Sequence, residues 1–396
     1  MTTLEPSFGG APPSGVRRPT RRVLIGHVPV GGGAPVCLQS MTSTPTRDID
    51  ATVAQIHRLA AAGCDVVRVA VPDPEDTAAL PEILRQSPLP IVADVHFHYR
   101  RALEAVAAGV HKIRLNPGNI SDRAQVNEVI RACRERGIPI RIGVNEGSVV
   151  ERRDREVRAA EQIALAADRR GNLIALMVRK LEEYIRIFEA QDFHDVVLAA
   201  KSPDPVVVIE ACRAISRRFD YPLHLGVTHA GPPETGRIRS IAALATLLAE
   251  GIGDTIRISY AADPEIEVRD GRELLCCLGL RARAEPELIA CPTCGRIEVD
   301  LIPLVQKVRQ KLADVRVPVK VAVMGCVVNG PGEAEGADVA VFAGRGRGVI
   351  YVQGRQVRTV DEPQMLDALH EEVVRLADRV QRGEATLSAT AVNIRP

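Results

Sequence analysis

Lys112-Ile113-Arg114-Leu115 is a short stretch in which basic residues alternate with large apolar residues, and the same pattern recurs along the chain. Related stretches are Val66-Val67-Arg68-Val69, Ile140-Arg141-Ile142-Gly143 and Ile256-Arg257-Ile258-Ser259. A period of two is typical of a β-strand, which sends successive side chains to opposite faces. A basic residue inside an apolar strand must therefore point into an interior that offers it a partner.

Apolar, β-branched runs of this kind follow one another along the first two thirds of the chain, and helical patterns separate most of them. The runs are Val36–Ser40, Asp65–Val71, Pro90–Val95, Lys112–Asn116, Pro139–Val144, Val196–Lys201, Pro222–Val227 and Thr255–Ser259. The helical patterns include Asp50–Ala62, Pro74–Arg85, Tyr99–Ala108, Ser121–Arg136, Asp204–Arg218, Ile238–Glu250 and Glu273–Leu280. Strands that alternate with helices predict a parallel sheet. We expect an α/β protein with a closed (β/α)₈ TIM-type barrel, and an open doubly wound sheet is the alternative.

The rest of the 396-residue chain divides around this barrel. Residues 1–16 contain Gly, Pro and Ser without a continuous apolar run, so they predict a disordered tail rather than a signal peptide. The barrel should span residues 17–284. Residues 285–385 predict a small α+β domain, and 386–396 a flexible tail. The expected elements of the α+β domain are helices at Leu301–Leu312 and Glu362–Arg382 and strands at Val319–Met324, Asp338–Ala343 and Val349–Gln353.

Composition excludes several classes of function. A net charge of +1, 3% aromatic residues and no Trp speak against nucleic-acid binding. No apolar run approaches the roughly 18 residues that cross a bilayer. Without an export signal, the nine cysteines indicate a reducing cytoplasm, where they serve as ligands or core residues rather than disulfides. Cys276 and Cys277 lie in an apolar helical pattern and are expected to be buried core residues.

Basic residues gather where the predicted strands end. In a (β/α)₈ barrel the catalytic groups lie at the C-terminal ends of the strands. Asp94 is the evident carboxylate there, so the basic residues cannot all pair internally and should hold a di- or polyphosphate. These residues are Arg68, Arg114, Arg141, Lys201 and Arg257, and the neighbouring polar residues include Asn145, His229 and Ser259.

Three cysteines mark a candidate metal centre in the second domain. Cys291 and Cys294 are three positions apart, so a tight turn can bring both thiols to one metal. Cys326 follows an apolar strand pattern and opens a Gly/Pro-rich loop that ends at Glu333. Three thiols are one ligand short of the usual four, and Glu333 is our candidate for the fourth. A structural zinc ribbon and a [4Fe–4S] cluster both remain open on this spacing.

Several longer motifs resemble one known family. They are Gln39-Ser40-Met41-Thr42, Val66–Val71, Ala93–Phe97, Arg114–Ile120, Arg141–Asn145, His224–Thr228, Glu250–Ser259, Cys291–Cys294 and Met324–Glu333. Together they resemble the bacterial 4-hydroxy-3-methylbut-2-en-1-yl diphosphate synthases of the non-mevalonate isoprenoid pathway. The resemblance runs from about residue 17 to the terminal helix.

The resemblance implies a barrel followed by a ferredoxin- or sulfite-reductase-like domain that carries a [4Fe–4S] cluster. It implies reductive ring opening and dehydration of 2-C-methyl-D-erythritol 2,4-cyclodiphosphate with two electrons from flavodoxin or ferredoxin. It also implies a homodimer whose site closes between two chains. The implied cluster ligands are Cys291, Cys294, Cys326 and Glu333; the substrate-binding residues are Arg68, Arg114, Arg141, Asn145, Lys201, Arg257 and Ser259; and Asn329 contacts the substrate from the cluster loop.

The chain departs from the family pattern at two places. His229 follows His-Leu-Gly-Val-Thr where the family usually has Glu, so an acid–base role at this position falls to an imidazole. Residues 146–192 match poorly, and we assign no contacts there. Two other functions compete on residue grounds: a phosphate- or pterin-binding barrel transferase with a structural zinc domain, and a non-enzymatic zinc-ribbon docking module.

Overall fold

The structure is a computed structural model that describes residues 17–95, 98–115, 120, 122–149, 169–326, 334, 336–344 and 346–388. The chain divides into two compact units, residues 1–282 and 283–396, whereas the expected boundary lay at 284/285. The tail expected at 1–16 lies outside the described residues, as does 389–396 of the second tail. Of that tail, Thr386 and Ser388 both hydrogen-bond to the second unit, to Gln353 and Asp338.

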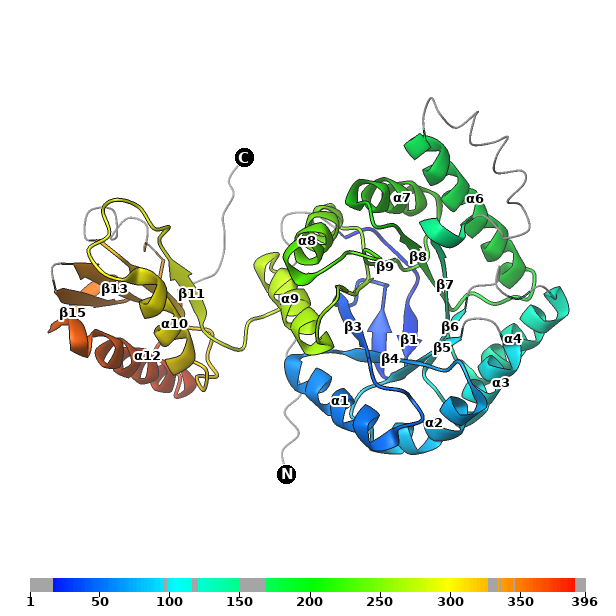
Figure 1. Cartoon of the computed structure of the whole chain (residues 1–396), viewed down its shortest axis with the longest axis horizontal. Coiled ribbons are helices and arrows are strands. Elements are labelled where there is room, and N and C mark those ends of the chain that lie inside the picture. Colours follow the sequence, from blue (N-terminus) through cyan, green and yellow to red (C-terminus); the bar gives the residue numbers. More distant parts are fainter. Residues whose placement is uncertain are drawn as a thin grey trace. The chain divides into compact units, whose positions relative to one another are not determined.

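The first unit contains the predicted barrel (Figure 1). Its strands are β3 (Cys37–Met41), β4 (Val66–Ala70), β5 (Ile91–Val95), β6 (Lys112–Leu115), β7 (Ile140–Asn145), β8 (Val196–Lys201), β9 (His224–Leu225) and β10 (Thr255–Ile256). They pair in parallel in the order β8-β7-β6-β5-β4-β3-β10-β9. A parallel bridge between Leu198 and Leu223 brings the two ends of this order together. The (β/α)₈ expectation is therefore confirmed, and the open sheet is wrong.

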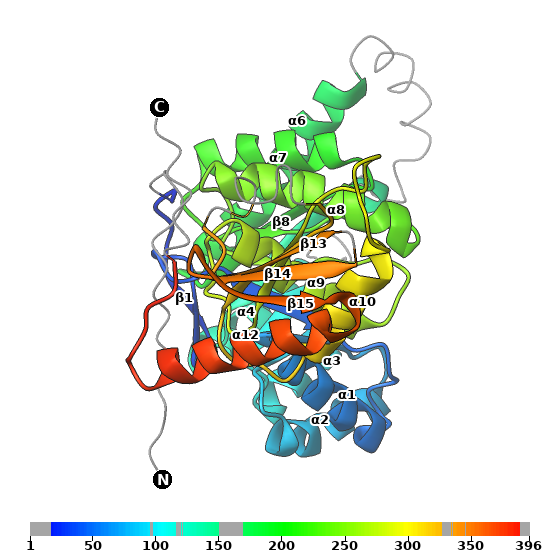
Figure 2. The ribbon, with the colours of Figure 1, turned by 90° about the vertical axis from the view of Figure 1, so that its left-hand side faces the viewer.

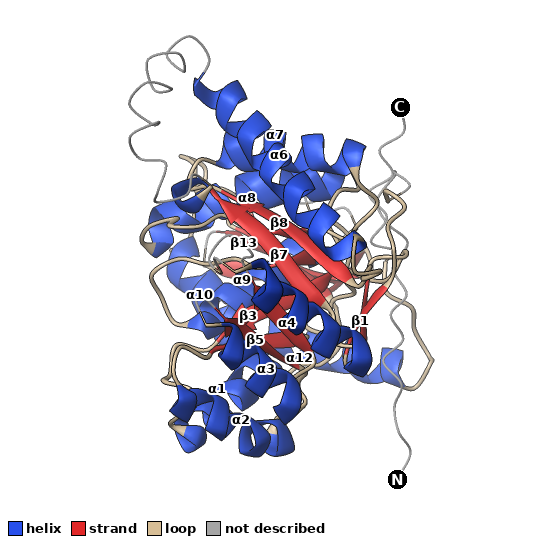
Figure 3. Cartoon of the chain, turned by 90° about the vertical axis from the view of Figure 1, so that its right-hand side faces the viewer, coloured by secondary structure: helices blue, strands red, loops and turns tan. Residues whose placement is uncertain are grey.

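Helices surround the strands, as Figure 3 shows in blue around red. They are α1 (Ile49–Ala62), α2 (Pro74–Gln86), α3 (Tyr99–Ala108), α4 (Arg123–Arg136), α6 (Arg169–Glu189), α7 (Pro205–Arg218), α8 (Pro233–Ala249) and α9 (Pro264–Cys277). The last two begin earlier than predicted because Pro233 and Pro264 occupy the first helical position, where proline is favoured. Cys276 is half-buried and Cys277 exposed at the end of α9, so the expectation of two buried cysteines is wrong.

A β-hairpin packs against the inner face of the barrel strands. It consists of β1 (Val23–Ile25) and β2 (Val28–Val30), which pair antiparallel. Ile25 and Val30 form an apolar cluster with Cys37, Val66 and Val92, which lie near the starts of their strands. The hairpin therefore covers the barrel interior at the end opposite to the strand ends.

The second unit is a five-stranded sheet covered on one face by helices (Figure 2). The sheet contains β11 (Glu287–Ala290), β12 (Lys320–Met324), β13 (Val339–Gly344), β14 (Arg347–Val352) and β15 (Arg355–Asp361), paired in that order. Its two longest helices, α10 (Leu301–Lys311) and α12 (Met365–Gln381), share one apolar core with the sheet. The predicted α+β arrangement is confirmed, with β11 and β15 added to it. No helix in the described part of the chain is long and apolar enough to cross a membrane.

Candidate active site

The strand-end cations point into the barrel as their alternation predicts. The exposed fractions of Arg68, Arg114, Arg141 and Lys201 are 8%, 9%, 4% and 8%. Their apolar neighbours, such as Val67 and Ile113, instead belong to the core shared with the helices. Arg257 directly follows β10, and its side chain is 16% exposed. The five cations lie close enough to influence one another's ionisation.

Among the described residues, two carboxylates pair with these five cations. Asp94 lies between two arginines, with its oxygens 3.5 Å from Arg68 Nε and 3.1 Å from Arg114 Nη1. Glu267 lies 3.7 Å from Arg257 Nη2 and accepts a 2.8 Å hydrogen bond from the Tyr260 amide. Positive charge therefore exceeds negative charge in this buried space.

Glu267 was missed by the sequence analysis, which recognised Asp94 alone. It lies in the first turn of α9 and is 4% exposed. The sequence did contain a signal: Glu267 stands between two apolar residues, Ile266 and Val268, which is compatible with a buried carboxylate. The helix was predicted only as including Glu273–Leu280, so Glu267 was not assigned to the barrel.

Burial lowers the pKa of Arg68, Arg141, Lys201 and Arg257, and repulsion by neighbouring cations adds to this effect at Arg68, Arg141 and Lys201. Burial, followed by the charges of Arg68 and Arg114, holds the pKa of Arg141 well below its usual range. The pKa of Arg68 falls to about 10, mainly because of burial. Arg141 Nη1 and Arg257 Nε are buried and have no hydrogen-bond partner among the described residues. Unsatisfied buried donors of one charge require an anionic ligand.

A methionine occupies the place where an acceptor is needed. The Nε and Nη2 atoms of Arg68 lie 3.1 Å and 2.9 Å from the sulfur of Met41, and Arg257 Nη1 lies 3.7 Å from it. A thioether is a weak acceptor. An oxyanion that entered between these guanidinium groups would replace a weak interaction with charge-assisted hydrogen bonds.

An open pocket of about 410 Å³ adjoins Arg257. Its lining includes His229, Ser259 and Glu267. His229 is exposed and has a φ of 52°, and its Nδ1 lies 3.3 Å from Thr228 Oγ1. Ser259 donates a 3.2 Å hydrogen bond to the Val227 carbonyl. Asn145, at the end of β7, is half-buried beside the strand that carries Lys201.

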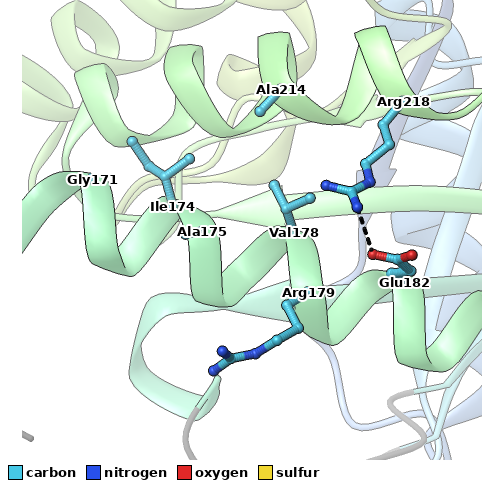
Figure 4. Close-up of a pocket in the computed structure, with 8 residues that line it drawn as sticks. All are labelled: Gly171, Ile174, Ala175, Val178, Arg179, Glu182, Ala214 and Arg218. Carbon is cyan, nitrogen blue, oxygen red and sulfur yellow. Dashed lines mark ion pairs between the residues drawn. The ribbon is translucent and has the colours of Figure 1, made fainter.

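A larger hollow of about 510 Å³ lies elsewhere, between α6 and α7 (Figure 4). Arg218 and Glu182 form a 3.1 Å ion pair across it, and Ile174, Val178 and Ala214 supply apolar walls. None of the predicted site residues lines this hollow. The strand-end region is therefore the better candidate for chemistry.

The cysteines lie in the second unit. Cys291 follows β11 and Cys326 follows β12, and these two strands are parallel neighbours with Ala290 opposite Val323. Both cysteines consequently leave the sheet at the same edge. Cys291 and Cys326 are half-buried, and Cys294 is exposed in the loop after β11.

The turn beside these cysteines is tight. The Gly325 amide donates a 3.3 Å hydrogen bond to Cys291 Sγ, an interaction that stabilises a thiolate in an iron–sulfur site. A Cβ atom at residue 325 would lie 2.8 Å from Ile297 Cγ2, so only glycine fits without a shift. The soft donor set and this amide suit an iron–sulfur cluster.

The remaining two predicted residues, Asn329 and Glu333, lie outside the described residues. Across the part of the chain that is described, no group of three His, Cys, Asp or Glu side chains is placed to hold a metal ion. The structure thus brings Cys291 and Cys326 to one edge of the sheet, with Cys294 in the loop that follows β11.

Known proteins match both units. Residues 20–272 match the GcpE TIM-barrel domain, and residues 287–375 match the GcpE protein C-terminal domain. A protein of Geobacillus thermodenitrificans named 4-hydroxy-3-methylbut-2-en-1-yl diphosphate synthase (flavodoxin) is 46% identical over 95% of this chain and 98% of its own length. A protein of Symbiobacterium thermophilum with the same name is 48% identical over 92% of this chain and 95% of its own.

Proposed function

The chain belongs to the GcpE family, and from this premise we propose that it is a 4-hydroxy-3-methylbut-2-en-1-yl diphosphate synthase. Such an enzyme opens the ring of 2-C-methyl-D-erythritol 2,4-cyclodiphosphate and removes one hydroxyl as water, with two electrons supplied from outside. The observation that carries the proposal is the excess of buried cations over carboxylates among the described residues at the strand ends, because a cyclic diphosphate brings two negative charges that would offset most of this excess.

Arg141 and Lys201 are the residues best suited to grip the diphosphate directly. Both are more than nine-tenths buried, and neither forms an ion pair with a described carboxylate. Arg68, Arg114 and Arg257 are already oriented by carboxylates and can contribute a second row of donors. Asn145 and Ser259 would add neutral hydrogen bonds around the same anion.

Asp94 and Glu267 orient the arginines rather than react. Asp94 holds two guanidinium groups from neighbouring strands, and Glu267 fixes Arg257 against the turn at Tyr260. An arginine that is held in position before binding loses less conformational freedom when the ligand arrives. The carboxylates thus reduce repulsion in the free barrel and preserve the geometry of the site.

Cys291, Cys294, Cys326 and Glu333 would hold a [4Fe–4S] cluster. When bound, this cluster supplies the two electrons one at a time. Cys294 is exposed, which suits electron transfer from an external protein. We propose flavodoxin or ferredoxin as this electron donor. Asn329, from the same loop, would orient the substrate.

Departure of the hydroxyl as water requires a proton, and His229 is our candidate to hold it. The imidazole lines the pocket that also contains Arg257, Ser259 and Glu267. Its Nδ1 lies beside Thr228 Oγ1, which leaves Nε2 available to a substrate oxygen. We further propose a homodimer in the cytoplasm, where a reducing environment keeps the ligand cysteines as thiols.

The alternative of a pterin-binding transferase with a zinc domain is not supported, since both units match the GcpE family. The test is anaerobic purification followed by iron, sulfide and zinc analysis and by turnover of the cyclodiphosphate with reduced flavodoxin. We expect brown protein with about four iron and four sulfide per chain and formation of the linear diphosphate. Colourless protein with stoichiometric zinc and no turnover would refute the proposal.

A further inference from the structure

Lys112 is a fully buried basic residue that the proposed reaction does not use. It lies on β6 two residues before Arg114, so both side chains project from the same face of the strand into the barrel. Its exposed fraction is 0%. It therefore lies one layer deeper than the cations at the strand ends, toward the end that the β1–β2 hairpin covers.

Its surroundings offer very little compensation for a positive charge. Lys112 Nζ donates a 3.2 Å hydrogen bond to Gln39 Oε1, which is a neutral amide oxygen. No ion pair with a carboxylate is formed by this lysine within the described ranges. Asp94 lies on the neighbouring strand β5, opposite Arg114, and already pairs with Arg68 and Arg114.

Among the described residues, the titratable groups that act most strongly on Lys112 are cations or, like the Cys37 thiol, neutral. Arg141 and Arg68 act on it as like charges. Burial raises the pKa of the Cys37 thiol, which therefore stays protonated, and burial holds the pKa of His224 well below its usual range, which keeps this imidazole neutral. Thr255 lies 3.3 Å from His224 Nδ1, and the neighbouring strands β4 and β5 contribute the apolar Val66 and Val92.

Building on the proposed function, we propose that Lys112 is neutral in the empty barrel and takes up one proton from solvent when the diphosphate binds above it. The ammonium group that forms keeps its hydrogen bond to Gln39. The negative charge of the ligand replaces the carboxylate that the barrel lacks. Lys112 is thus a positioning residue that adjusts the charge of the site, and ligand binding and protonation are one coupled event.

Electrostatics supports this coupling. Burial, followed by the charges of Arg141 and Arg68, lowers the pKa of Lys112 to about 7. At pH 8 about nine-tenths of these side chains would consequently be neutral in the free protein. Two negative charges placed among the arginines should raise the pKa of Lys112 again. They offset the repulsion by Arg141 and Arg68, and their attraction for an ammonium group counteracts the cost of burying it.

Isothermal titration calorimetry can count the proton. Cyclodiphosphate is titrated into the oxidised holoenzyme without an electron donor at pH 8, in HEPES and in Tris, whose ionisation enthalpies differ. Each phosphorus of this ligand carries a single, strongly acidic oxygen, so the ligand itself stays ionised. We expect an apparent enthalpy that depends on the buffer and corresponds to an uptake of about one proton by Lys112, to which uptake by Lys201 adds, and a smaller uptake by Lys112 at pH 6.

Lys112→Met provides the decisive comparison. It should lower the proton uptake at pH 8 by about one proton and weaken binding by roughly tenfold, the effect of one charge acting through a protein interior. Should Lys112→Met fold poorly, the double variant Gln39→Leu/Lys112→Met removes both hydrogen-bond partners together. Any uptake that remains is assigned to Lys201, whose pKa is also held below its usual range by burial.

The outcomes separate this inference from the proposed function. Equal proton uptake by the wild type and the variants overturns the role of Lys112 while the binding site stands. If the wild type binds the cyclodiphosphate tightly without taking up a proton, the role of Lys112 is overturned as well. Failure of the wild type to bind the cyclodiphosphate at all refutes the proposed function, and this inference with it.

Discussion

At the scale of single residues, the described part of the barrel mouth holds more cations than carboxylates. Arg141 shows the consequence most clearly, because it is 4% exposed and Nη1 has no described hydrogen-bond partner. Its neighbours Arg68 and Arg114 repel it. The group is therefore unfavourable for the free protein and favourable only once an anion binds.

Arg141→Ala should separate these two effects. A charge-assisted hydrogen bond contributes about 1.5–3 kcal/mol, so we expect the dissociation constant for the cyclodiphosphate to rise about 10- to 150-fold. The midpoint of thermal unfolding should stay unchanged or rise, because repulsion is relieved. Calorimetry and circular dichroism measure the two quantities. Arg218→Ala, which breaks a surface pair on α7, is the control and should change neither. A large loss of stability in Arg141→Ala would identify it as a structural ion-pair member instead.

Glu267 makes a prediction about pH. Burial raises its pKa above the ordinary value of 4.5, although Arg257 opposes the shift. Above pH 4.5 the folded protein consequently holds a proton that the unfolded chain has lost, and stability falls as pH rises toward the folded-state pKa. Glu267→Gln cannot titrate. The unfolding midpoint of Glu267→Gln minus that of the wild type should therefore increase as pH rises from 4.5, and this difference should become constant above the folded-state pKa of Glu267.

Circular dichroism suits this measurement because the chain has no Trp. A difference between Glu267→Gln and wild type that is independent of pH would show that the carboxylate is not desolvated. The same variant should bind the cyclodiphosphate more weakly, since Arg257 loses the partner that orients it.

At the scale of elements, the alternating strands were predictable and the polar elements were less so. Strands such as β6 and β7 could be recognised because apolar residues face the helices while basic residues, Lys112 and Arg114 in β6 and Arg141 in β7, point inward. β15 was missed because it is an exposed edge strand of mostly polar residues, and β11 because it has only four residues. The start of α9 was missed as well, and with it Glu267. The sequence thus revealed the cations of the site but only half of their counter-charge.

Gly226 links an element to the site. A Cβ atom at this residue, just after β9, would lie 2.9 Å from the Arg257 carbonyl oxygen and 2.9 Å from Lys201 Nζ. Gly226→Ala should lower stability by about 1–3 kcal/mol through overpacking, and it should weaken substrate binding because Lys201 must move. Thermal unfolding and calorimetry report the two effects. Gly147→Ala meets no atom within 4 Å and is the matched control; equal effects of both substitutions would contradict the role of close packing at β9.

At the scale of the whole molecule, the barrel and the second unit have separate apolar cores, and we propose a separate task for each unit. The barrel core and the core of the second unit share no residues, and the predicted cluster ligands and the strand-end cations are divided between them. Damage to one task should therefore leave the other intact. The fold and family were recognisable from sequence because long motifs occur in both units, whereas the coupling of Lys112 to the site required its burial and its neighbours.

Cys294→Ala and Glu333→Ala test this division of tasks. Loss of a thiolate should abolish the cluster, so Cys294→Ala is expected to be colourless and inactive while it binds the cyclodiphosphate with nearly wild-type affinity. Glu333→Ala should keep part of the iron and sulfide, because a carboxylate is the weakest of the four proposed ligands, yet lose nearly all turnover. Iron analysis, visible absorption and calorimetry on the same samples distinguish the two variants. Arg141→Ala provides the reciprocal case, a coloured protein with weak binding. Full activity in Glu333→Ala would remove the carboxylate from the ligand set, and loss of substrate binding in Cys294→Ala would show that the two units do not act independently.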